Sequence, residues 1–65
     1  MQYHIEYSKM GFWTNAVGTF TDIRQGSYDT LGMAQKDMYF AASNNPSYTF
    51  RIVTIHEYRI NKVSC

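Results

Sequence analysis

The stretch that decides the fold is YTFRIVTIH, Tyr48–His56. β-Branched and aromatic residues dominate it, which favours a β-strand. Phe50 and Ile52 share one face of such a strand, and Val53 and Ile55 share the other. Apolar residues on both faces are typical of a central strand, or of a strand that is bulged midway. The sequence therefore predicts a strand over Tyr48–His56 that lies inside a sheet.

A second strand is predicted at the N-terminus, over residues 2–8. Tyr3, Ile5 and Tyr7 alternate there with polar residues, which is the period of a strand with two unlike faces. The following four residues, Ser8–Gly11, can turn the chain, because Gly11 is able to take a positive φ. The N-terminal strand is therefore expected to begin a hairpin.

The other arm of this hairpin is predicted over Phe12–Thr21, which is rich in aromatic and β-branched residues. The short connection makes the two strands antiparallel. Gly18 inside the second strand indicates a bulge or a close backbone contact.

A helix is predicted next, because apolar residues recur at spacings of three and four. Asp29 or Thr30 can cap its start, and the run Ser43–Pro46 is expected to end it through an Asn in a left-handed cap and a proline. Lys36 and Asp37 fall outside the predicted apolar stripe. The stripe itself consists of Leu31, Ala34, Met38 and Ala41.

These elements predict a single α+β domain, residues 1–65, with the order β-β-α-β. An antiparallel sheet of three strands would carry the helix on one face, and residues 57–63 could extend the last strand or add a fourth one. The first or the third strand would be central. Because one helix covers one face, the other face is expected to be open and partly apolar, which marks an interaction site or a dimer interface.

Composition argues against several functional classes. The net charge of +1 provides no strong field for nucleic acid, and no segment resembles a signal peptide or a membrane span. The lone cysteine, Cys65, cannot form an intramolecular disulfide, which favours a reducing, cytoplasmic location. We expect a complete natural product that begins at Met1.

No set of residues indicates catalysis or a cofactor. His4 and Glu6 share a strand face and could chelate a metal together with His56, but this spacing is unspecific, so solvated or capping histidines are expected instead. The glycines are scattered rather than gathered in a phosphate-binding loop. The sequence therefore predicts a protein that is not an enzyme and needs no metal or cofactor.

Aromatic residues make up 17% of the chain, which is a large share for so small a domain. A chain of about 60 residues leaves much of its surface exposed, so some aromatic side chains must lie outside the core. Large amphipathic side chains at a surface are typical binding anchors. The predicted contact residues are Tyr3, Tyr7, Trp13, Tyr58 and Arg59.

Two functions use such a surface. The first is inhibition or modulation of a larger protein, through the aromatic sheet face or an added edge strand. The alternative is a module that binds single-stranded nucleic acid or a nucleotide by stacking bases on the same face. The nearly neutral charge and the lack of an RNA-recognition motif favour the first. A homodimer would cover the same surface.

The sequence also resembles, in style, the short proteins encoded by bacteriophages. The features that carry this resemblance are the Tyr/Ile strand at the N-terminus, Phe12-Trp13, the helix opening Ser27–Leu31, the stop at Asn45-Pro46 and the strand Tyr48–Val53. Many such proteins inhibit a host enzyme or a bacterial defence system, CRISPR–Cas complexes included. The resemblance implies a bacterial protein or complex as the partner, in the host cytoplasm, and assigns no residue a role.

Overall fold

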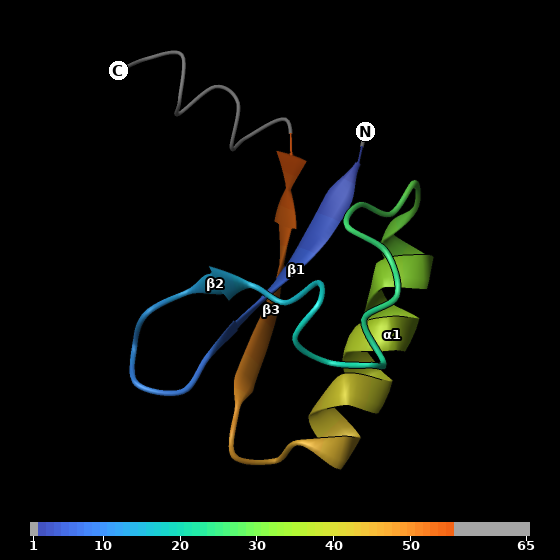
Figure 1. Ribbon diagram of the computed structural model, residues 1–65. Coiled ribbons are helices and arrows are strands. Elements are labelled where there is room, and N and C mark those ends of the chain that lie inside the picture. Colours follow the sequence, from blue (N-terminus) through green and yellow to red (C-terminus); the bar gives the residue numbers. More distant parts are fainter. Residues whose placement is uncertain (1, 56–65) are drawn as a thin grey trace, which may run out of the picture.

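Three strands and one helix make up the computed structural model, which describes residues 2–55 (Figure 1). The elements in chain order are β1 (Tyr3–Ser8), β2 (Thr14–Asn15), α1 (Leu31–Asn44) and β3 (Thr49–Thr54). The predicted α+β fold, with an antiparallel three-stranded sheet and one helix, is confirmed. The suggested fourth strand over residues 57–63 lies outside the described residues.

The first strand, β1, is the centre of the sheet, whose order is β2-β1-β3. β1 pairs with β3 along its whole length, from Tyr3 opposite Thr54 to Ser8 opposite Thr49. Its other side is occupied by β2 and, at its start, by an isolated bridge in which Tyr3 and Tyr28 exchange two backbone hydrogen bonds of 2.9 and 2.7 Å. Of the two strands that could be central, the structure therefore has the first, whereas the interpretation of Tyr48–His56 as a central strand is wrong, because β3 is an outer strand of the sheet that residues 2–55 form.

The strand predicted over Phe12–Thr21 is much shorter, because β2 covers only Thr14–Asn15. Local hydrogen bonds turn the chain there: the Asn15 carboxamide oxygen accepts from the Val17 N–H at 2.9 Å, and the Thr19 N–H donates to the Ala16 carbonyl at 3.2 Å. Gly18 lies in this turn with φ of +82°, and a Cβ there would meet nothing within 4 Å. It therefore marks neither a bulge nor a close contact, but a turn that needs a positive φ.

The helix has the predicted bounds, with one difference at its end. Thr30 is the N-cap, and its hydroxyl oxygen accepts from the Met33 N–H at 3.3 Å. At the C-cap, Asn45 has φ of −137°, so no left-handed residue ends the helix. Instead, the Asn45 side-chain amide donates to the carbonyl of Ala41 at 2.9 Å and satisfies a terminal acceptor.

Replacing the N-cap, Thr30→Ala, should lower the free energy of unfolding by about 1 kcal/mol, because it removes the acceptor for a helix-terminal N–H. Urea denaturation measures the loss. The matched control is Asp29→Ala at the other candidate cap, where a change within about 0.5 kcal/mol is expected. A larger loss for the Asp29 variant than for the Thr30 variant would contradict the assignment of the cap.

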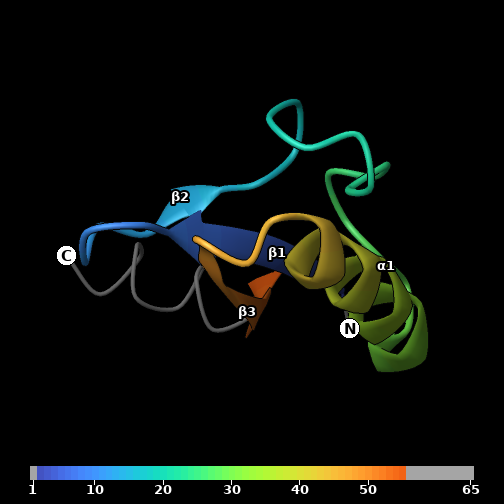
Figure 2. The ribbon, with the colours of Figure 1, turned by 90° about the horizontal axis from the view of Figure 1, so that it is seen from below.

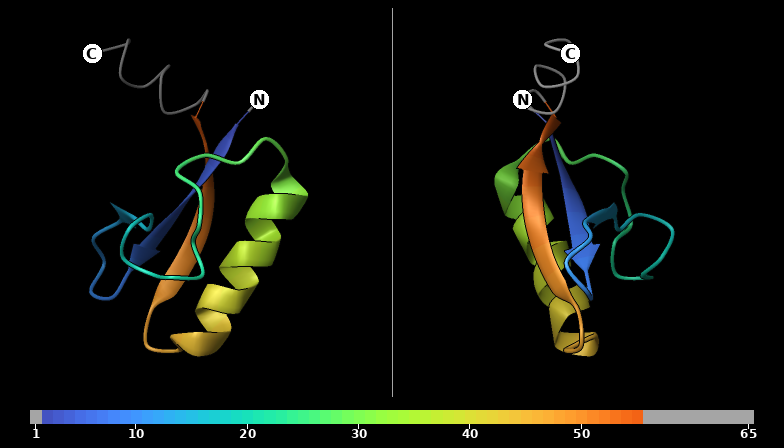
Figure 3. Two further views of the ribbon diagram at one scale, coloured as in Figure 1. Left: turned by 45° about the vertical axis from the view of Figure 1, so that its right-hand side comes forward. Right: turned by 90° about the vertical axis from the view of Figure 1, so that its left-hand side faces the viewer.

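The core lies between the sheet, α1 and the connection formed by residues 16–30, which runs from β2 to the helix (Figure 2). Phe20, from this connection, is its aromatic centre. The Phe20 ring makes edge-on contacts with Tyr7, Phe50 and Tyr48, at centroid distances of 4.9, 5.1 and 5.2 Å. The buried apolar residues are Ile5, Ala16, Phe20, Ile23, Tyr28, Ala34 and Ala41. Much of the core therefore comes from a segment without regular structure, whose looping path between β2 and α1 is seen in Figure 3.

Candidate functional site

The predicted contact residues do not share one surface. Tyr3 and Tyr7 project from β1 toward the core and are half-buried against it. Trp13 adjoins β2 and contacts Arg51, which projects from the opposite sheet face. Tyr58 and Arg59 lie outside the described residues. The structure thus separates Trp13 from Tyr3 and Tyr7.

The sheet face opposite the core is mainly polar, and its apolar residues include Val53, opposite His4, and Trp13, against Arg51. Glu6 and Arg51 lie opposite each other on β1 and β3, and the Glu6 carboxylate accepts from Arg51 Nη2 at 2.7 Å and Nε at 2.8 Å. His4 Nε2 lies 3.3 Å from the other Glu6 oxygen. His4 is buried, so of the two roles expected for the histidines, solvated or capping, the solvated one is wrong for His4.

Burial alone would raise the pKa of Glu6, but its hydrogen bonds with Arg51 and His4, and the charges of those groups, outweigh burial. The pKa of Glu6 is therefore lowered, and the ionised carboxylate holds β1 and β3 together on this face. Among residues 2–55, no group of three side chains is placed to ligate a metal. The third residue weighed for such a site, His56, lies outside this range.

Trp13 is fixed by a cation–π contact. The guanidinium carbon of Arg51 lies 4.2 Å from the centroid of a Trp13 ring. Because Arg51 also binds Glu6, the three side chains form a connected row across the sheet. Trp13 remains 37% exposed, so its ring is both positioned and accessible.

The tip of the β1–β2 hairpin is the most exposed apolar feature among the described residues. Met10 is 84% exposed and Phe12 is 83% exposed, on either side of Gly11. Gly11 has the predicted positive φ, +95°, and its N–H donates to the Ser8 hydroxyl oxygen at 2.9 Å. We define Met10, Phe12 and Trp13 as the hairpin tip. The sequence signal for it was present: apolar residues flank a turn glycine, where burial is rare.

A second cluster was not predicted and centres on Asp37, which is only 3% exposed. The Tyr28 hydroxyl donates to Asp37 Oδ2 at 2.6 Å. Arg24 donates from Nη2 to Oδ1 at 3.1 Å and from Nε to Oδ2 at 3.5 Å. The prediction that Asp37 lies outside the buried stripe is wrong, because Asp37 is three residues after Ala34 and four before Ala41, so it shares their face.

The electrostatics of this cluster favour an ionised carboxylate. Burial raises the pKa of Asp37, but the hydrogen bonds from Tyr28 and Arg24 outweigh it, and the pKa is lowered overall. The pKa of Tyr28 is raised by burial and by its bond to Asp37, and the pKa of Arg24 is raised by Asp37. The cluster therefore joins the connection to α1 through a buried charge.

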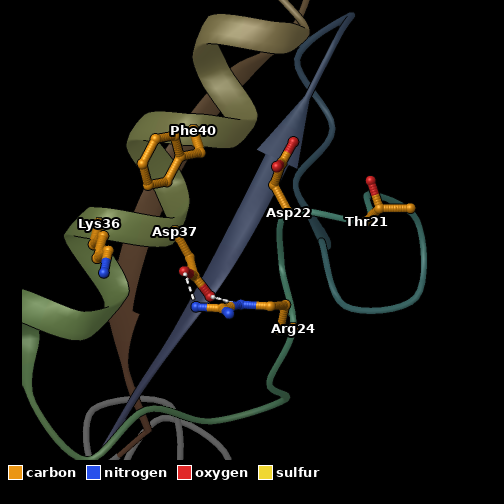
Figure 4. Close-up of a pocket in the computed structure, with 6 residues that line it drawn as sticks. All are labelled: Thr21, Asp22, Arg24, Lys36, Asp37 and Phe40. Carbon is orange, nitrogen blue, oxygen red and sulfur yellow. Dashed lines mark hydrogen bonds and ion pairs between the residues drawn. The ribbon is translucent and has the colours of Figure 1, made fainter.

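A pocket of about 360 Å³ opens beside this cluster (Figure 4). One wall comes from the connection and the other from α1. Phe40, which is 46% exposed, and Lys36 stand one helical turn apart on the second wall. The complete lining is Thr21, Asp22, Arg24, Lys36, Asp37 and Phe40.

Comparison with known proteins gives no relative from which a role could be transferred. No protein-family model, no curated protein and no solved structure matches the chain. Within residues 2–55, no helix has the length and apolarity needed to cross a membrane. Two local features of the described residues are therefore candidate sites: the hairpin tip and the pocket beside Asp37.

Proposed function

We propose that this protein is a small non-enzymatic binding protein that inhibits or modulates a larger protein, and that the hairpin tip is its main contact. The observation that carries the proposal is the exposure of Met10 and Phe12, at 84% and 83%. Burying a Phe or Met side chain against a partner would contribute about 1.5–3 kcal/mol. Aromatic and Met side chains are also enriched in the cores of protein interfaces.

The hairpin tip meets a second requirement, which is a fixed geometry. The bond from the Gly11 N–H to Ser8 organises the turn, and Arg51 holds the Trp13 ring. A contact surface that is ordered before binding loses less conformational entropy when the complex forms. Met10 adds a flexible, polarisable side chain that can adapt to the partner. The tip thus combines rigid and adaptable anchors.

The resemblance to short phage proteins supplies the class of partner. It supports a bacterial host or defence protein, or a complex of them, in the cytoplasm as the target. Tyr3 and Tyr7, two of the contacts predicted from sequence, pack against the core, so replacing them would disturb the fold as well as any interface. Trp13 is the contact predicted from sequence that the hairpin tip retains.

The alternative, stacking of single-stranded nucleic acid on the sheet, has less support. Base stacking needs aromatic rings on an accessible face. Tyr7 and Phe50 instead pack with Phe20 from the connection. Binding of this kind would weaken steeply as salt concentration rises. A mixed oligonucleotide titrated at two salt concentrations separates it from protein binding.

The test of the proposed function is affinity capture from nuclease-treated bacterial lysate, followed by mass spectrometry. The tagged wild-type chain should retain one dominant protein in stoichiometric amount. Phe12→Ser should reduce retention of that protein at least about tenfold, because loss of an interface anchor costs more than about 1.4 kcal/mol. The fold should survive, since the Phe12 side chain is exposed.

Tyr39→Ser is the matched control, because Tyr39 is also an exposed aromatic residue, at 68%, but lies on α1. It should leave retention unchanged. Equal retention by the wild type and the Phe12 variant would refute the assignment of the tip. Loss of the captured protein in both variants would point to a different surface.

A further inference from the structure

The pocket beside Asp37 is lined by charged, polar and aromatic groups, whereas the hairpin tip is apolar. Residues 21–24 of the connection and residues 36–40 of α1 face each other across it (Figure 4). Its volume of about 360 Å³ lies near the lower end of the range of small-molecule sites, about 300–1,000 Å³. The lining includes two cations, two carboxylates, a hydroxyl and an aromatic ring.

One of the two carboxylates is already neutralised. Both oxygens of Asp37 accept hydrogen bonds, from Tyr28 and from the Nε and Nη2 groups of Arg24. A guanidinium group carries five N–H donors, so Arg24 keeps donors that this contact does not use. Because Asp37 fixes the guanidinium group, the remaining donors stand at the pocket in a defined position.

The cation on the facing wall has no such partner. Lys36 makes no hydrogen bond or ion pair with any of residues 2–55. Two basic side chains from two different elements therefore face one small pocket: Arg24, whose charge is paired with Asp37 but which keeps unused N–H donors, and the unpaired Lys36. Two cations that converge on a pocket are suited to a phosphate group, whose oxygens accept charge-assisted hydrogen bonds.

The rest of the lining favours an aromatic compound with a hydrogen-bond donor. Phe40 follows Lys36 by four residues, is 46% exposed overall and lines the same pocket. Asp22 accepts a hydrogen bond from the Asn44 amide through Oδ2, at 3.0 Å, whereas Oδ1 accepts none from residues 2–55. That second oxygen can accept from an amino group on a ligand.

We propose that this pocket binds a nucleoside monophosphate whose base carries an exocyclic amino group. The phosphate lies between Arg24 and Lys36, the base stacks on Phe40, and the amino group donates to Asp22. A base stacked on an aromatic side chain and a phosphate held by cations are the two recurrent modes of nucleotide binding. The site is separate from the hairpin tip and does not depend on the proposed protein partner.

The test is a titration of the ¹⁵N-labelled full chain with adenosine 5′-monophosphate, followed by amide chemical shifts. Saturable shifts are expected in residues 21–24 and 36–40, and not at the hairpin tip. Adenosine and inorganic phosphate should each bind more weakly, because each lacks one half of the contact. Inosine 5′-monophosphate, which replaces the amino group by a carbonyl, should also bind more weakly, because its carbonyl faces Asp22.

Matched variants assign the contacts. Phe40→Ala and Lys36→Gln should each weaken binding of adenosine 5′-monophosphate by about tenfold, through lost stacking and a lost phosphate contact. The controls are Tyr39→Ala, the neighbouring helix aromatic, and Lys9→Gln, an exposed lysine on the hairpin. Both controls should bind as the wild type does, and the amide spectrum of each variant reports that its fold is retained.

Three results would overturn the proposal. The first is the absence of saturable shifts at about 10 mM nucleotide. Any remaining affinity would then be weaker than that of a specific site of this kind. The second is equal affinity for inorganic phosphate and for the nucleotide, because it would exclude a contact of the base with Phe40. The third is an equal loss of binding in the pocket variants and their controls.

Discussion

Phe20→Ala is expected to lower the free energy of unfolding by about 3–5 kcal/mol, the range for removing a buried aromatic side chain. The Phe20 ring contacts Tyr7, Tyr48 and Phe50, so its loss opens a cavity bordered by two strands and the turn that follows α1. A domain of this size has only about 3–10 kcal/mol of stability in total. The substitution therefore removes much of it, and guanidinium denaturation measures the loss.

Phe12→Ala is the control for this experiment, because it deletes the same ring at a position that is 83% exposed. Its effect on stability should stay within about 0.5 kcal/mol. If the Phe20→Ala variant does not fold, Phe20→Leu provides the measurement, with an expected loss of about 1 kcal/mol. Equal stability of the Phe20 and Phe12 variants would show that the connection is not part of the core.

Asp37→Asn is expected to lower the free energy of unfolding at pH 7 by about 2–3 kcal/mol. Hydrogen bonds to a charged group contribute about 1.5–3 kcal/mol, and Asp37 accepts such bonds from both Tyr28 and Arg24. Asparagine has one oxygen and no charge, so it cannot replace them. Asp29→Asn, at an exposed position, is the control and should change the stability little.

The pH dependence of the same variant tests the charge of Asp37 separately. The pKa of Asp37 is lowered in the folded protein, so its contribution is present above the pKa of the unfolded chain and is lost as the pH falls through the folded pKa. Between about pH 5 and pH 2, the wild type should therefore lose stability more steeply than Asp37→Asn. Parallel curves for the two proteins would show that Asp37 is not a stabilising carboxylate.

The sequence was sufficient for the elements whose signals are local. The alternation of residues 2–8, the cap at Asp29 or Thr30 and the stop near Asn45-Pro46 each act over a few residues. The structure contains the strand, a cap at Thr30 and a helix end at Asn44, although Asn45 is not left-handed. The central strand could not be identified in this way, because strand order depends on contacts between distant residues. The bridge between Tyr3 and Tyr28 is such a contact, and nothing in the local sequence around either residue indicates it.

The length of the second strand and the core role of the connection could not be predicted from sequence, for a related reason. β-Propensity over Phe12–Thr21 was high, but the side chain of Asn15 and the positive φ of Gly18 turn the chain instead. Phe20 could then pack inward from a turn. Its burial depends on three rings that come from other elements, which periodicity within one segment does not reveal.

The sequence predicted that aromatic side chains would be exposed, but not which residues form the candidate sites. Surplus aromatic residues correctly indicated exposed rings, but among residues 2–55 the most exposed rings are Phe12 and Tyr39, whereas Tyr3 and Tyr7 pack against the core. Asp37 was missed because a charged residue in an apolar stripe is normally assigned to the solvent side. Its partners, Tyr28 and Arg24, come from a segment whose path could not be derived from sequence.

The central position of β1 has a consequence for how the chain assembles. Tyr3 pairs with Thr54, so the longest ladder of the sheet joins residues at opposite ends of the described chain. Closing so large a loop costs entropy before any contact compensates it, and domains with many distant pairings fold in milliseconds to seconds rather than in microseconds. The hairpin and α1 can form early from neighbouring residues, whereas the sheet is completed only when β3 joins. Until that step, β1 presents an unpaired edge, and a newly synthesised chain is then most prone to pair with other chains.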